Sequence, residues 1–180
     1  MHYHIYSKKD ILELITLYCH EIDATLASID DKTFSYHIPS KWSIADHLEH
    51  LSMANGILAI SLKLPKFIIR QVGGQPELWR SSEEIIALYQ RKLSEGAKSN
   101  FAFDPKFIFK NKKLTTILWK NAYESLLSAI NAWEEADMDQ YCMPHPIIGK
   151  VTVREMLFFT SYHIYHHGNT IKTLALYSKV

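Results

Sequence analysis

The chain has 180 residues, of which 47% are hydrophobic and 22% are charged, and its net charge at neutral pH is +1. These values match globular domains and exclude a chain that is mainly disordered. Two cysteines are too few for a disulfide-stapled miniprotein, and the nearly balanced charge gives no electrostatic case for nucleic-acid binding. We therefore expect one globular domain over residues 1–180, with no nucleic-acid partner.

The start of the chain lacks the features of a signal peptide or a membrane anchor. Charged Lys8, Lys9 and Asp10 interrupt its apolar residues. No stretch of the chain approaches the ~18 consecutive apolar residues of a membrane span. Cys19 and Cys142 do not have zinc-ribbon spacing, and we expect both to be small buried side chains in a reducing compartment. The sequence therefore predicts a cytoplasmic protein with no membrane partner.

Helical periodicity dominates the sequence in chain order, while glycine and proline are scarce, with six of each. Four periodic segments begin with a Ser/Thr-x-x-Asp/Glu pattern, which caps a helix through a hydroxyl and a carboxylate. The four patterns are Ser7–Asp10, Ser43–Asp46, Ser81–Glu84 and Thr152–Glu155. The predicted helices span residues 8–29, 43–64, 82–97, 112–136 and 152–177. This pattern predicts an all-α four-helix bundle with an additional short helix, 82–97, and connecting loops.

Three connecting segments are expected to be irregular. Residues 65–76 carry two prolines and a Gly-Gly pair, and residues 143–149 carry two prolines. Residues 101–110 are rich in aromatic side chains and are expected to form a lid, a pocket wall or a dimer surface. The aromatic residues are Phe101, Phe103, Phe107 and Phe109.

Histidine is the unusual residue of this chain, with ten in 180. His163 and His167 are four residues apart in the last predicted helix, so their imidazoles lie one turn apart on one face. That spacing suits two ligands of one metal ion. On a helical wheel both point toward the buried face, whereas His166 points outward. The same pattern is explained equally well if both histidines are ordinary core residues, each with a hydrogen-bond partner.

The helix predicted over residues 43–64 supplies a candidate third ligand. His47 lies near the centre of its apolar stripe, and His50 lies at the edge of that stripe. The edge of one helix face still meets a neighbouring helix in a bundle, so either side chain can reach a site between the two helices. Periodicity leaves the choice between His47 and His50 open.

Three motifs occur in order along most of the chain: KWSI with a following HL at residues 41–44 and 50–51, HPIIGKVT at 145–152, and YHIYHH at 162–167. Together they resemble the DinB/YfiT-like superfamily in its DinB_2-type branch. The resemblance implies a bundle with one divalent metal ion held by three histidines, one from the second helix and two from the last. By position these are His50, His163 and His167. His47 is then a residue that supports or replaces His50.

The resemblance also implies a chemistry. Three neutral imidazoles leave an open coordination position, which is typical of catalytic zinc. We expect zinc, with nickel or iron as alternatives. The family further implies a small-molecule substrate, including a low-molecular-weight thiol, thiol S-transfer or hydrolysis as the reaction, and a homodimer.

No catalytic side chain is assigned from the sequence. Glu49 is expected to point away from His50, and Asp46 and Glu155 are expected to cap helices, so no general base is apparent. Two alternatives to an enzyme stay open. One is a non-catalytic stress-response or binding protein with a structural or vestigial metal site. The other is a plain bundle in which the histidines only pack.

Overall fold

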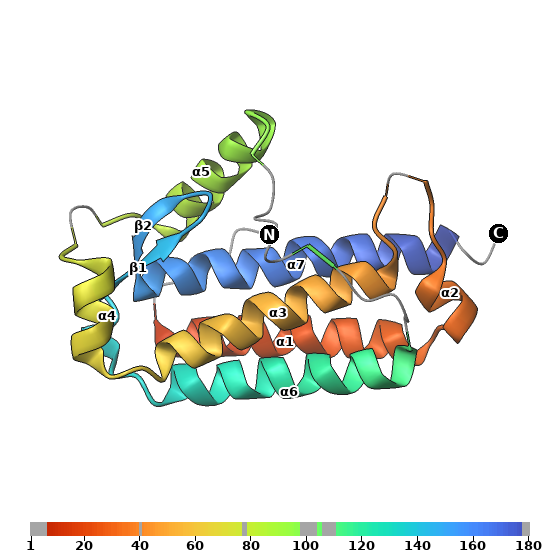
Figure 1. The fold of residues 1–180 in the computed structure, drawn as a ribbon, viewed down its shortest axis with the longest axis horizontal. Coiled ribbons are helices and arrows are strands. Elements are labelled where there is room, and N and C mark those ends of the chain that lie inside the picture. Colours follow the sequence, from red (N-terminus) through yellow and green to blue (C-terminus); the bar gives the residue numbers. More distant parts are fainter. Residues whose placement is uncertain (1–6, 40, 77–78, 98–103, 106–110, 178–180) are drawn as a thin grey trace.

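A computed structural model describes residues 7–39, 41–76, 79–97, 104–105 and 111–177. Its four long helices lie along one common axis (Figure 1) and are α1 (Lys8–Ala27), α3 (Ile44–Leu62), α6 (Lys112–Asn131) and α7 (Val153–Tyr177). Helices α1 and α7 run in one direction, and α3 and α6 run in the other. Contacts of α3 with α6, α1 with α7, α1 with α6 and α3 with α7 close the bundle. The predicted four-helix bundle is therefore confirmed.

The helices begin where their sequence patterns predict. In all four patterns the hydroxyl accepts a backbone N–H three residues on, and the carboxylate accepts the N–H of the capping residue. Each cap satisfies backbone donors that the first helical turn leaves unpaired. The fourth long helix, α6, starts differently, because the Asn111 side chain accepts from the N–H of Leu114. These caps fix the starting residue, and hence the register, of α1, α3, α5 (Ser82–Ser94), α6 and α7.

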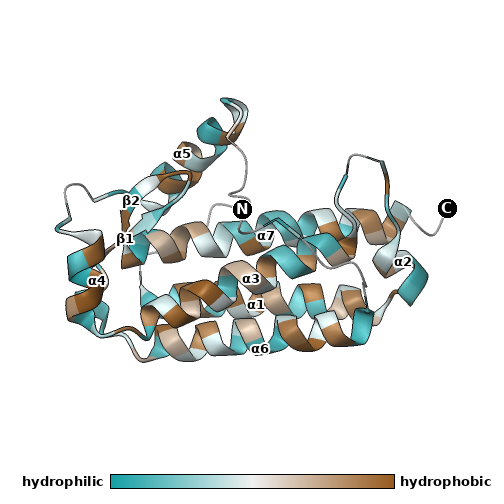
Figure 2. Cartoon of the chain, in the orientation of Figure 1, coloured by the Kyte–Doolittle hydropathy of each residue, from teal (hydrophilic) through white to brown (hydrophobic). Residues whose placement is uncertain are grey.

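An apolar core lies between the long helices. Figure 2 shows that each of them carries both hydrophobic and hydrophilic residues along its length, as amphipathic helices do. Trp119 of α6 is completely buried, and its indole N–H donates to Asp23 of α1 at 3.0 Å. Tyr123, one turn further along α6, donates to the same carboxylate at 2.9 Å. The core is thus mainly apolar, and these two hydrogen bonds to Asp23 fix the position of α1 relative to α6.

Two segments that were predicted to be irregular loops contain regular secondary structure, so these two predictions are wrong. Residues 65–76 contain a helix, α4 (Lys66–Gly73), because Pro65 precedes its first turn, where proline is tolerated, and the Gly-Gly pair ends it. Residues 143–149 belong to an antiparallel hairpin of β1 (Cys142–His145) and β2 (Gly149–Thr152). A two-stranded hairpin has only edge strands, so it accommodates proline.

Smaller differences concern the ends of helices. The predicted helix 112–136 ends at Asn131 and is followed by a 3-10 turn, Glu135–Asp137. A short helix that was not predicted, α2 (Asp31–Ser35), connects α1 with α3 and buries Phe34. Helix α5 packs on α7 and projects away from the bundle at the end that carries the hairpin (Figure 1).

No single described helix has the length and hydropathy of a membrane span, and α3 with α4 reaches them only as a pair bent by 112°. Neither Cys19 nor Cys142 forms a disulfide within the described part of the chain, and both are buried, as predicted.

Gly73 lets α4 approach the hairpin closely. A Cβ atom at this position would lie 1.7 Å from the carbonyl oxygen of Cys142 in β1, far inside van der Waals contact. We expect Gly73→Ala to separate α4 from β1 and to lower the free energy of unfolding by about 3 kcal/mol, measured by urea titration.

The matched control is Gly56→Ala in α3, where an added Cβ meets nothing within 4 Å. It is expected to raise stability by about 0.5–1 kcal/mol, because alanine is the better helix former. Equal stability of the two variants would contradict the close approach of α4 to β1.

Candidate metal centre and pocket

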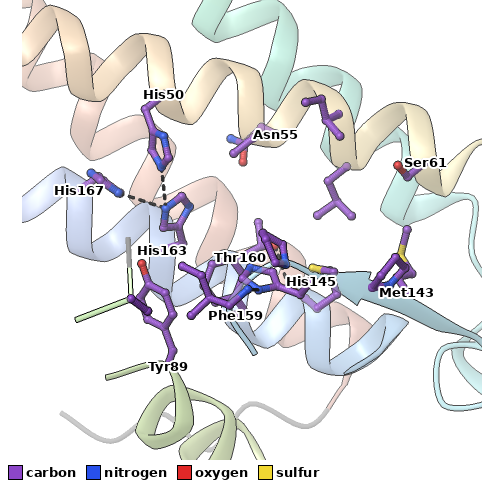
Figure 3. A pocket seen from close by; sticks show the side chains of 18 of the residues that line it. His50, Asn55, Ser61, Tyr89, Met143, His145, Phe159, Thr160, His163 and His167 are labelled. Atoms are coloured by element: carbon purple, nitrogen blue, oxygen red, sulfur yellow. Dashed lines mark hydrogen bonds between the residues drawn. The ribbon is translucent and has the colours of Figure 1, made fainter. Parts of the chain in front are cut away.

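Three histidines meet where α3 crosses α7. The Nε2 atom of His163 lies 3.1 Å from Nε2 of His50 and 3.1 Å from Nε2 of His167 (Figure 3). One nitrogen from each ring lies within 4.8 Å of the other two. Nitrogen ligands of a tetrahedral zinc ion, each about 2.0–2.1 Å from the metal, lie roughly 3.3 Å apart. The donor set and its spacing therefore fit a divalent ion.

All three imidazoles are removed from solvent, with exposed fractions of 5% for His50, 5% for His163 and 7% for His167. Aromatic rings hold them in place. The indole of Trp42 lies with its centroid 5.0 Å from that of His50, and it stacks on His167 at 6.1 Å. Phe159 stacks on His163 at 5.1 Å. The ring orientations are thus set by packing from α7 and from Trp42, which lies just before α3.

His47 occupies a different place from the other three. Its Nδ1 atom lies 2.8 Å from Nδ1 of His167, on the opposite side of that ring from Nε2. When His167 donates its Nδ1–H to Nδ1 of His47, the lone pair on Nε2 of His167 faces the other two histidines, which is the tautomer that a metal ligand needs. The helical wheel was right that His47 is buried, but His50 is the residue of α3 that faces His163. His166 is exposed, as predicted.

The electrostatic environment keeps the imidazoles of His47, His163 and His167 neutral. Burial lowers the pKa of His163 and His167 well below the usual value, and the other histidines of the cluster lower both further. Burial, together with His50, also lowers the pKa of His47 to about 4. A neutral imidazole keeps a lone pair on one nitrogen, which is the form that binds metal ions.

A cavity of about 830 Å³ extends from the cluster between α3, α4, α5, α7 and the hairpin. That volume lies in the usual range for small-molecule sites. Its lining is mostly apolar and includes Ile68, Ile69, Met143, Ile147, Met156 and Phe159. Polar groups in the lining include Asn55, Tyr89 and Thr160 (Figure 3). Helix α4 and Asn55 were not identified from the sequence, since neither carries a histidine or a recognisable motif.

Carboxylates are scarce in the described part of this cavity, where Asp104 is the one that lines it. The predicted capping roles of the other two candidates are confirmed: Asp46 accepts from Ser43, and Glu155 accepts from the N–H of Thr152 at 2.8 Å. Glu49 is buried and does not line the cavity. The aromatic segment that was expected to form a lid or a dimer surface, Phe101 to Phe109, lies outside the described residues apart from Asp104 and Pro105.

His145 of the hairpin borders the cavity and gives a pH prediction. Its Nδ1 atom accepts the N–H groups of Ile147 at 3.1 Å and Ile148 at 3.2 Å, so that nitrogen must be unprotonated. Burial lowers its pKa to about 4. Because this pKa lies below the unfolded value near ~6.5, the contribution to stability is complete above pH ~6.5 and is lost as pH falls toward about 4.

We expect protonation of His145 to lower the free energy of unfolding by about 2 kcal/mol when the pH is reduced from 7 to 5. Most carboxylates titrate below pH 5, so they contribute little to the change in this range. Urea titrations of the metal-free protein at the two pH values measure the loss. His145→Phe should remove this part of the pH dependence. A parent and a variant with the same pH dependence would show that His145 is not buried neutral.

The fold and the site define a helical bundle with a buried cluster of histidines at one end of a cavity. Residues 18–171 match the DinB superfamily, and the chain belongs to this family. No curated protein is similar to the chain in sequence.

Solved structures share the fold. YfiT from Bacillus subtilis, described as a probable metal-dependent hydrolase with an unusual four-helix bundle topology, is 11% identical with a TM-score of 0.65, covering 99% of this chain and 93% of that one. The four-helix bundle protein TT2238 is 15% identical with a TM-score of 0.62, covering 93% and 99%. The colibactin self-resistance protein ClbS, solved in complex with a dsDNA, is 12% identical with a TM-score of 0.54, covering 93% and 94%. Because ClbS shares this fold and was solved with dsDNA, the fold does not support the expectation that this chain has no nucleic-acid partner.

Proposed function

We propose that this protein is a metal-dependent enzyme in which His50, His163 and His167 hold one divalent ion and the adjoining cavity binds a small organic substrate. Zinc is the first choice of metal, with nickel and iron as alternatives. The convergence of three buried Nε2 atoms at the end of a cavity is the observation that carries this proposal. A purely packed histidine cluster does not require three nitrogens to face one point.

Bound there, a divalent ion supplies Lewis-acid chemistry, which lowers the pKa of water or of a thiol. The protein supplies the rest. His47 orients His167 through its Nδ1 atom, and Trp42 and Phe159 shield the ring faces from water. Since the rings of His163 and His167 are buried and neutral, they have no positive charge to repel the ion.

Two reaction classes suit this site, each favoured by one observation. Thiol S-transfer is favoured by the scarcity of carboxylates in the described cavity, because a thiol deprotonated at the metal needs no protein base. Hydrolysis is favoured by the likeness in fold to YfiT, which is described as a probable metal-dependent hydrolase. We place thiol S-transfer first. The homodimer and the cytoplasmic location expected from the sequence belong to the same proposal.

Metal analysis and turnover test the proposal together. The purified chain should contain about one divalent ion per protein by mass spectrometry, and chelation should remove it. The metal-loaded protein is then assayed with a small thiol plus an alkylating electrophile, and separately with an apolar ester in the absence of thiol. Loss of the first activity on chelation supports S-transfer, and loss of the second supports hydrolysis. Stoichiometric metal without either activity would favour the non-catalytic alternative, and absence of metal would refute the site.

A further inference from the structure

We infer that Asn55 binds an acceptor oxygen of the substrate, and that an apolar tail of the substrate lies beyond that oxygen, away from the histidines. This inference rests on the proposed function, because it takes the histidine cluster as the place where the reacting group binds.

Asn55 is a buried polar residue with an unused donor. Its side chain is 1% exposed, and its Nδ2 atom has no hydrogen-bond partner among the described residues. Leaving a buried amide donor unpaired lowers stability, so such groups are rare unless they have a function. Asn55 lines the cavity and projects from α3 toward α7 (Figure 3). A rotation of the terminal amide exchanges its NH₂ and its carbonyl, so the donor can face a bound ligand.

The position of Asn55 defines the order of groups along the cavity. It lies five residues after His50, which corresponds to about 7.5 Å along α3. On α7, which runs in the opposite direction, Thr160 lies three residues before His163 and also lines the cavity. Figure 3 shows Asn55 and Thr160 between the histidines at one side and Ser61 and Met143 at the other. An acceptor oxygen at Asn55 is therefore a few bonds away from a group bound at the histidines.

Beyond Asn55 the lining is mostly apolar, with Ser61 as a polar exception. Leu58 of α3, Ile69 of α4, Met143 of β1 and Met156 of α7 are buried and line this end. An alkyl chain or ring placed there leaves water for an apolar surface, which stabilises the complex in proportion to the area buried. The substrate class is thus an acyl compound, amide or ester, with its reacting group on one side of the carbonyl and an apolar tail on the other.

The probe for this arrangement is N-octanoylcysteamine, which joins a thiol, an amide carbonyl and an alkyl tail in that order. Calorimetry with the zinc-loaded protein measures its affinity. Asn55→Leu should weaken binding roughly tenfold, since it removes one hydrogen bond at nearly constant volume. The same variant should bind octane-1-thiol, which has no acceptor, as tightly as the parent does. N-acetylcysteamine, which lacks most of the tail, should bind the parent at least about a hundredfold more weakly than the octanoyl compound.

Thr116→Val is the matched control. Thr116 Oγ1 in α6 is the other buried side-chain nitrogen or oxygen atom without a hydrogen-bond partner among the described residues, and Thr116 does not line the cavity. Its replacement should leave all affinities unchanged. Asn55→Leu should also leave the melting temperature of the ligand-free protein unchanged or raised, because it removes the unpaired donor. A purely structural asparagine would instead lower the melting temperature and leave the preference for the amide probe intact.

Equal affinity of parent and Asn55→Leu for N-octanoylcysteamine would overturn the role of Asn55, and equal affinity for the acetyl and octanoyl compounds would overturn the apolar tail. The tail comparison uses the unaltered chain, and Asn55→Ala replaces Asn55→Leu if leucine prevents folding. N-(2-hydroxyethyl)octanamide separates this inference from the proposed function. This compound has a hydroxyl in place of the thiol. If it binds as tightly as N-octanoylcysteamine and Asn55→Leu still weakens its binding, then Asn55 does bind the acceptor oxygen, but the reacting group does not bind at the histidine cluster.

Discussion

His167→Ala is expected to abolish stoichiometric metal binding, measured as the metal-to-protein ratio after dialysis against trace zinc. The substitution removes one of three imidazoles and also separates His47 from the cluster. A site with two remaining ligands loses the closed donor set that holds zinc, so we expect the affinity to fall by at least about three orders of magnitude. His50→Ala and His163→Ala should have the same effect.

His166→Ala is the control, since His166 is the exposed neighbour of His167 on the same helix. It should retain about one ion per chain. His47→Ala separates two roles: a residue that orients His167 through Nδ1 should weaken the affinity only about 10–100-fold. Complete loss of metal in His47→Ala, together with full retention in His50→Ala, would show that His47 and not His50 is the ligand from α3.

Glu155→Ala is expected to lower the free energy of unfolding by about 3 kcal/mol, because it breaks a buried ion pair that carries several hydrogen bonds. The carboxylate is 1% exposed and accepts from the backbone N–H, Nε and Nη2 of Arg80 at 2.8–2.9 Å. It also accepts the N–H of Thr152. This one side chain therefore joins the segment before α5 to the start of α7, and Arg80 continues to the hairpin through the carbonyl of Lys150.

Thermal and urea unfolding measure the effect, which corresponds to a decrease of roughly 6–12 °C in melting temperature for a chain of this size. Glu13→Ala is the matched control, because Glu13 forms an exposed i,i+4 pair with Lys9 and should contribute less than about 0.5 kcal/mol. A decrease no larger in Glu155→Ala than in Glu13→Ala would mean that the Arg80–Glu155 pair does not hold α5 in place.

Elements governed by local patterns could be predicted from the sequence. Capping by Ser7, Ser43, Ser81 and Thr152 depends on contacts three residues away, so each helix start was read correctly. The shared face of His163 and His167 follows from helical periodicity in the same way. The hairpin was missed because prolines 144 and 146 indicate only that a helix is excluded, and α4 was missed because its flanking Gly and Pro resemble loop signals.

The sequence by itself determined the amphipathic helices, their starts and the histidine pair of α7, because these depend on neighbours within one or two turns. Periodicity left open which histidine of α3 faces that pair, and the family resemblance pointed to His50. The tertiary structure places Nε2 of His50 against His163 and Nδ1 of His47 against His167, because the crossing of α3 with α7 brings the two buried rings to different partners. The unpaired amide donor of Asn55 was likewise visible only in the tertiary structure. Whether a buried donor finds a partner depends on atoms from other helices, which no local pattern encodes.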